Sequence, residues 1–135
     1  MPEPFETKIL GATPDAVAPD GSLVRLLPRL AGGSSAHFEL AAGATAHAVK
    51  HRTVEEIWYV LSGRGELWRS RDGAARIEPL TPGTALTIPL GTAFQFRAAP
   101  EAPLTFLALT MPPWPGMDEA VPAEGPWTPT APLKG

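Results

Sequence analysis

A histidine and a glutamate lie close together near the middle of the chain, in the stretch HRTVEEIWYVLSG that begins at His51. An imidazole and a carboxylate can hold a metal ion, or they can act as a general base and the group that orients it. If His51 and Glu56 both point into an apolar interior, neither is expected to stay unpaired. The pair therefore indicates either a functional site or a satisfied buried hydrogen bond.

The elements that must position these two groups are short strands. The 17 prolines and 13 glycines interrupt the apolar stretches, and turn signals such as PDG, SGRG, RDG and TPG lie between them. Nine strands in one small domain predict an all-β sandwich or barrel. The expected strands are SLVRLL, AHFELA, AHAVKH, EIWYVL, GELWRS, ARIEPL, ALTIP, AFQFRA and LTFLALT.

Two spaced motifs then give the chain a family resemblance. The motifs are His51, four residues, Glu56, six residues, Gly63, and later Gly83, five residues, Pro89, one residue, Gly91. In this order they resemble the two signatures of the cupin superfamily, over roughly residues 22–110. The resemblance implies a double-stranded β-helix, or jelly-roll, barrel that is commonly dimeric. It also implies that the barrel often holds one divalent metal ion on three histidines and a glutamate.

Half of the metal ligands that the resemblance implies are replaced. His51 and Glu56 match two of them, whereas the first histidine of the family pattern falls on Val49 and the last falls on Phe94. Valine and phenylalanine have no donor atom for a metal. Two protein ligands are fewer than catalytic zinc or a non-haem iron triad uses. We therefore expect no tightly bound cofactor, while iron, nickel, manganese or zinc stays possible if a third ligand exists.

His37 and His47 are the candidates for that third ligand. His47 shares a strand face with His51, but four residues along a strand span about 13 Å. A metal would need both within ~2.0–2.1 Å, so a bulge would be required. His37 lies on an earlier strand whose register the sequence does not give.

The residues that replace the metal ligands predict an apolar binding site. Together they would form an aromatic and aliphatic inner wall, suited to a small organic molecule that one or two polar groups orient. The alternative is that these side chains fill the barrel completely. The residues concerned are Val49, Trp58, Val60, Phe94 and Phe96.

Two classes of function stay open at this point. The first is a binding module, in which His51 and Glu56 orient a small molecule without a tight metal. The second is a small enzyme, either an isomerase, epimerase or cyclase that uses the same two residues as an acid/base pair, or an oxygenase with a weakly bound metal. The resemblance does not decide between them, because fold does not imply function.

Composition limits the partners. The net charge of −3 and the scattered basic residues exclude a basic stripe for nucleic acid, and no apolar run is long enough to span a bilayer. No cysteine is present, and the N-terminus lacks a signal-peptide pattern. We expect a cytoplasmic homodimer that binds a small molecule. Its parts would be an N-terminal arm or edge strand (residues 1–21), the cupin barrel (22–110) and an ordered arm rich in proline and tryptophan (111–135).

Overall fold

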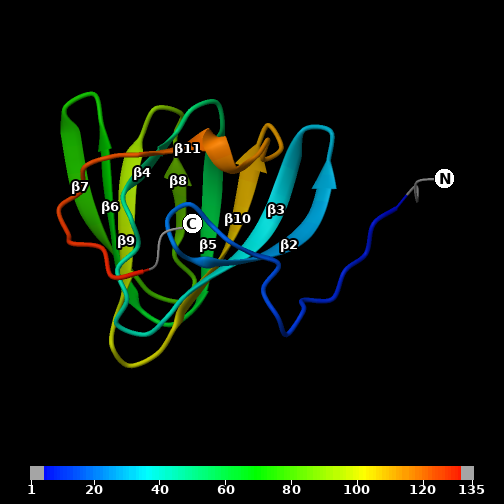
Figure 1. Ribbon diagram of the computed structural model, residues 1–135, viewed down its shortest axis with the longest axis horizontal. Coiled ribbons are helices and arrows are strands. Elements are labelled where there is room, and N and C mark those ends of the chain that lie inside the picture. Colours follow the sequence, from blue (N-terminus) through cyan, green and yellow to red (C-terminus); the bar gives the residue numbers. More distant parts are fainter. Residues whose placement is uncertain (1–4, 132–135) are drawn as a thin grey trace.

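The computed structural model describes residues 5–131, and in them the chain forms two antiparallel sheets that face each other as a barrel (Figure 1). One sheet has the strand order β1-β2-β3-β10-β5-β8 and the other β11-β4-β9-β6-β7. The first four residues of the expected N-terminal segment and the last four of the C-terminal arm lie outside the described range. The elements are β1 (Ala16–Val17), β2 (Leu23–Leu30), β3 (Gly33–Leu40), β4 (Val49–His51), β5 (Glu55–Ser62), β6 (Gly65–Arg71), β7 (Ala74–Leu80), β8 (Ala85–Ile88), β9 (Ala93–Ala98), β10 (Leu104–Met111), the 3-10 turn η1 (Met117–Glu119) and β11 (Ala120–Pro122).

The all-β prediction is confirmed, and each of the nine expected strands is present at least in part. The largest difference is in AHAVKH, where only Val49–His51 is a strand. Among the described residues no helix is long and apolar enough to cross a membrane.

Glycines occupy turn positions where a side chain would clash or where φ is positive. Gly63 has φ +80°, and a Cβ on it would meet the carbonyl oxygen of Pro103 at 2.1 Å. This turn carries the chain from β5 in one sheet to β6 in the other, so it closes a barrel corner rather than a hairpin. Asp72 and Gly73 both have positive φ and join β6 to β7 as a two-residue hairpin loop.

Aromatic side chains fill the barrel between the sheets. Trp58 stacks on Phe106 with ring centroids 4.1 Å apart, and its ring meets Phe94 and Phe96 edge to face at 5.5 and 5.3 Å. Phe38 also stacks on Phe106, with ring centroids 5.3 Å apart. These pairs come from both sheets, so the aromatic cluster joins the two layers.

The segment after β10 returns along β4 and supplies the edge strand β11. β11 pairs with β4, placing Ala120 opposite His51. The contact continues beyond the strand, because the amide of Ala123 donates to Ala48 and those of Thr130 and Ala131 donate to Thr45. In Figure 1 this segment, coloured orange to red, crosses the end of the barrel and descends on the side of β6 and β7. The arm therefore covers its own barrel.

Gln95 fixes the arm to the outer face of β9. Its side chain is fully buried; its amide donates to the carbonyls of Ala46 and Trp127, and its oxygen accepts from the Trp127 amide. The Arg97 guanidinium lies 4.1 Å from the centroid of the Trp127 ring, a cation–π contact. Gln95 lies on the outer face by strand alternation, and its buried side chain connects β9 to the arm through Trp127.

Replacing Gln95 with alanine should release the arm. The substitution leaves the carbonyl of Ala46 and the backbone of Trp127 without their partner, and each unsatisfied buried group costs roughly 1–3 kcal/mol. We expect lower unfolding stability in urea and faster proteolysis within residues 123–131, with the barrel intact. The exposed Glu124 in the same arm is the control, and Glu124→Ala should change neither quantity. Equal protease resistance of Gln95→Ala and wild type would contradict this assignment.

Candidate functional site

The sequence motif comes together at one end of the barrel, which we call the barrel mouth: the end crossed by residues 111–122 (Figure 1). His51 is the last residue of β4, and Glu56 is the second residue of β5. Strand pairing places Thr110, near the end of β10, directly opposite Glu56. All three side chains are buried.

Glu56 is bonded within the protein through both carboxylate oxygens. The indole Nε1 of Trp58 donates to Oε1 at 2.9 Å, and the hydroxyl of Thr110 donates to Oε2 at 2.6 Å. Trp58 is two residues further along the same strand, so strand alternation brings its ring to the same face. The carboxylate therefore joins β5, β10 and the aromatic cluster.

His51 has a different environment. Its ring lies between two aromatic rings, with centroids 5.1 Å from Phe94 and 5.2 Å from Trp114, both at steep edge-on angles. Nδ1 is buried and has no hydrogen-bond partner among the described residues. His51 and Glu56 both point inward as expected, but no hydrogen bond joins them within the described range. The satisfied buried hydrogen bond between them, one of the two alternatives from the sequence, is thus not formed among the described residues.

Trp114 covers His51 from the segment that follows β10. Its backbone amide donates to the hydroxyl of Ser34 at 3.0 Å, which attaches the segment to β3. Trp114 belongs to the arm that the sequence marks as rich in proline and tryptophan, but its contact with His51 depends on the path of the chain. The described structure therefore has an aromatic cover over the imidazole.

Two carboxyl groups near His51 were missed by sequence reasoning. Asp20, in the turn before β2, is buried, and its Oδ1 accepts from the amide and hydroxyl of Ser22. Burial raises the pKa of the Asp20 carboxyl; the Ser22 hydrogen bonds lower it, the charge of Glu56 raises it and that of His51 lowers it, with a net increase. Asp20 therefore lies within electrostatic range of both motif residues. Its only sequence signal was a PDG turn.

Glu119 is the second of these carboxyl groups and holds the segment that crosses the barrel mouth. It accepts from the hydroxyl of Thr53 at 2.6 Å and from the amide of Val54 at 2.9 Å, and a further bond comes from the Thr53 amide. Burial alone would raise the pKa of Glu119, but these hydrogen bonds and the charge of His51 lower it overall. The loop between β4 and β5 is thus tied to η1.

The two other histidines do not reach the motif. His37 lies opposite Leu107 of β10, on the face of the sheet that points away from the interior. His47 precedes β4, and its Nε2 lies 2.7 Å from the carbonyl of Ala131; because a carbonyl only accepts, Nε2 carries the proton. Neither residue supplies the third metal ligand considered from the sequence.

The donor set at the barrel mouth does not fit a metal ion. Within residues 5–131 no group of three or more His, Asp or Glu side chains is placed to hold one. Val49 and Phe94, at the replaced ligand positions, pair across β4 and β9. Glu56 also has both oxygens engaged by Trp58 and Thr110, so ligation would break one of these bonds.

The expected ligand-binding residues lie in the interior and pack against one another. Each is at most 4% exposed: Val49, Trp58, Val60, Phe94 and Phe96. The structure also has a cavity of about 370 Å³ outside the barrel, between β4, β9 and the arm, lined by side chains that include His47, Gln95 and Trp127. Of the five expected residues only Val49 borders it.

Comparison with known proteins assigns the chain to a family. A cupin-domain profile matches residues 36–110, so the chain belongs to the cupin superfamily. The predicted double-stranded β-helix fold is thereby confirmed. A comparison with curated protein sequences finds no match.

Solved structures support the same fold. The capsular polysaccharide assembling protein CapF from Staphylococcus aureus superposes with a TM-score of 0.69 at 14% identity, over 78% of this chain and 33% of CapF. Oxalate decarboxylase from Bacillus subtilis gives 0.66 at 19% identity, over 78% and 28%. A Klebsiella pneumoniae protein with a double-stranded β-helix domain gives 0.66 at 14% identity, over 89% and 100%. This chain therefore spans about a third or less of the first two.

Asp20 should make stability depend on pH. Its pKa is raised in the folded protein, so as pH rises from about 3.8 through the folded value, the unfolded chain releases this proton first and stability is lost. Asp20→Asn should not show this loss. We expect the melting temperature of Asp20→Asn relative to wild type to increase across this window and then to stay constant. The control is the exposed Asp118→Asn, and a difference that is flat or falls with pH would contradict the raised pKa.

Proposed function

We propose that this cupin binds a small organic molecule at the barrel mouth, with His51 as its polar contact and without a tightly bound metal. The observation that carries the proposal is the contrast between the two motif residues. Both oxygens of Glu56 have partners inside the protein, whereas Nδ1 of His51 is buried with none among the described residues.

An unpartnered buried nitrogen favours a ligand energetically. Leaving such a group unsatisfied costs about 1–3 kcal/mol, and unsatisfied buried polar groups are few in folded proteins. A ligand hydroxyl or N–H group at Nδ1 would recover that free energy. Phe94 and Trp114, whose rings flank the imidazole, would contact the apolar body of the ligand.

The charges around His51 limit the class of ligand. Asp20, Glu56 and Glu119 all lie within electrostatic range of one another or of the imidazole. An anion at the barrel mouth would be repelled by these carboxyl groups. The site therefore favours a neutral or cationic aromatic molecule. Oxalate, which appears in the name of one structural neighbour, is a poor candidate on this ground.

The interior residues expected to bind the ligand take two roles in this proposal. Phe94 contacts the ligand directly, and Val49 lies beside it across the β4–β9 pairing. Trp58, Val60 and Phe96 pack with Val49 and Phe94 in one buried cluster. The enzyme alternative in which Glu56 orients His51 as a general base needs a contact between the two side chains, and Glu56 bonds to Trp58 and Thr110 instead.

Calorimetric titration with indole, tryptamine and benzoate tests the proposal. We expect indole or tryptamine to bind, benzoate to bind more weakly, and His51→Ala to lose about tenfold or more in affinity, which corresponds to about 1.4 kcal/mol. His47→Ala, which removes an imidazole outside the barrel mouth, is the control and should bind normally. Trp114→Ala should also weaken binding.

Two results would overturn the proposal. One is equal affinity of wild type and His51→Ala for every compound that binds. The other is a stoichiometric amount of iron, nickel, manganese or zinc in the purified protein that disappears in His51→Ala, since this would show a metal centre at the same residue.

A further inference from the structure

A second cavity, of about 320 Å³, lies between the hairpin of β6 and β7 and the turn that precedes β9. In Figure 1 this hairpin (green) stands on the opposite side of the barrel from β2 and β3. Among the described residues, none of those that surround His51 lines this cavity, so it is separate from the site proposed above. We call it the arginine cavity; its lining includes Arg69, Arg71, Arg76, Thr87, Pro89 and Thr92.

Positive charge is in excess along the arginine cavity. Strand pairing places Arg69 of β6 directly opposite Arg76 of β7, and like charges in that relation destabilise a sheet. A single carboxylate, that of Glu78, lies 3.7 Å from Arg69 and 3.5 Å from Arg76. Arg71 adds a third guanidinium, and its ion pair with Asp72 is long, at 3.9 Å, with an 87% exposed carboxylate. A bound anion would relieve the repulsion that these few carboxylates leave.

Two of the three guanidinium groups are held in place by the backbone on the other side of the cavity. Arg69 donates through Nη1 to the carbonyl of Thr87 at 2.8 Å, and Arg71 donates through Nε to the carbonyl of Leu90 at 3.2 Å. A guanidinium has five N–H groups, so each can still donate to a ligand. An arginine fixed in this way loses less conformational entropy when it binds an anion.

Thr92 gives independent support for a ligand in this cavity. It is 3% exposed, and its hydroxyl is buried without a hydrogen-bond partner among residues 5–131. Such a group has a free-energy cost. The turn of the second sequence motif positions it, because the Thr92 amide donates to the carbonyl of Pro89 at 3.1 Å. An acceptor oxygen in the cavity would give the hydroxyl its partner, directly or through one water.

We propose that the arginine cavity binds a phosphate monoester of a small organic molecule. The guanidinium fork matches phosphate oxygens, and a monoester carries close to two negative charges above its second pKa of about 6. The volume of about 320 Å³ falls within the range of small-molecule sites. Ala74, Ala75 and Pro89 also line the cavity and would contact the organic part.

Calorimetric titration with n-butyl phosphate at about pH 7.5, where the monoester is a dianion, and at constant ionic strength tests the proposal. Its aliphatic body keeps the probe distinct from the aromatic compounds expected at His51. We expect one site per chain, and at least tenfold weaker binding of n-butyl sulfate, which carries a single charge. Arg76→Gln should lose about tenfold or more in affinity. The Arg76 side chain is 77% exposed, so this substitution should not disturb folding.

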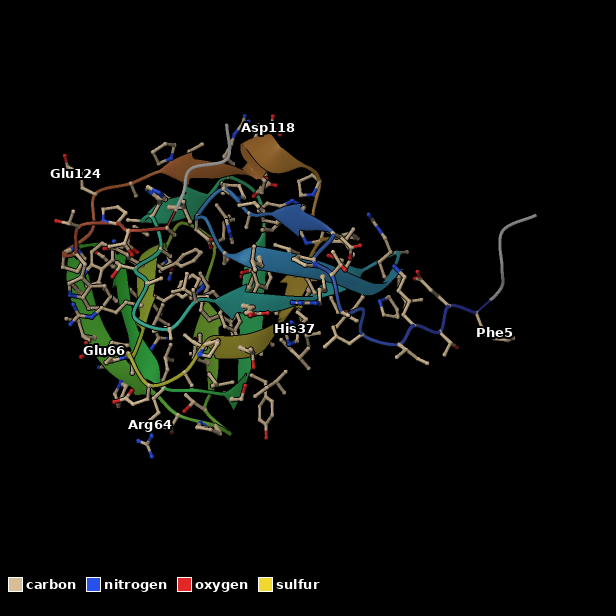
Figure 2. The ribbon with its side chains drawn as sticks, turned by 60° about the horizontal axis from the view of Figure 1, so that its bottom comes forward. Phe5, His37, Arg64, Glu66, Asp118 and Glu124 are labelled. Atoms are coloured by element: carbon tan, nitrogen blue, oxygen red, sulfur yellow. The ribbon has the colours of Figure 1, made fainter. Side chains whose placement is uncertain are left out.

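Arg64→Gln is the matched control, because it removes the same charge at the opposite end of β6. Arg64 is exposed, and in Figure 2 its side chain points away from the barrel. This variant should bind n-butyl phosphate as wild type does. Thr92→Val tests the hydroxyl: binding should weaken several-fold, while the melting temperature without ligand should not fall, because the hydroxyl has no hydrogen bond to lose among the described residues.

Three results would overturn the proposal. The first is no binding of n-butyl phosphate to wild type. The second is an equal loss of affinity in Arg64→Gln and Arg76→Gln, which would show attraction by overall charge rather than a site. The third is binding that Arg76→Gln leaves intact and His51→Ala abolishes, which would place the anion at the barrel mouth. Circular dichroism of each variant confirms that it is folded.

Discussion

The buried carboxylate of Glu56 is the constraint on which the barrel mouth depends. A carboxylate in an apolar interior must find donors, and Glu56 finds them in the Trp58 indole and the Thr110 hydroxyl. These two bonds connect neighbouring strands of one sheet to the aromatic cluster that joins both sheets. In a cupin with this donor set, the glutamate of the family motif has become a structural residue that orients Trp58.

Because both oxygens of Glu56 accept hydrogen bonds from Trp58 and Thr110, Glu56 does not pair with His51. Val49 and Phe94 occupy the positions of the two replaced histidines, and among residues 5–131 Nδ1 of His51 is buried without a hydrogen-bond partner. Trp114 lies over it instead, carried by a segment that Glu119 ties to the β4–β5 loop. Nδ1 of His51 thus lies among the rings of Phe94 and Trp114 and near the carboxyl groups of Asp20 and Glu119. These neighbours favour an organic ligand over an anion or a metal.

The sequence predicted the strands, the turns and the fold, because these depend on local residue patterns. Alternation and turn residues placed the strands, and the spacing of His51, Glu56 and the glycines identified the fold. The sequence did not predict contacts between distant segments. Nothing in PDG indicates that Asp20 lies near Glu56. Nothing in MDEAVP indicates that Glu119 accepts a hydrogen bond from Thr53. The hydrogen bond between His51 and Glu56, one of the alternatives from the sequence, does not form, because Trp58 and Thr110 donate to both oxygens of Glu56.

A long-range proton–nitrogen NMR correlation of the histidine rings tests most directly whether His51 contacts an organic ligand. The chain has three histidines, so His37→Gln and His47→Gln assign the His51 signals. On addition of tryptamine or indole we expect the His51 Nδ1 resonance to shift, and on addition of one equivalent of zinc or nickel we expect that resonance not to change. A His51 signal that responds to stoichiometric metal but to neither organic compound would contradict it.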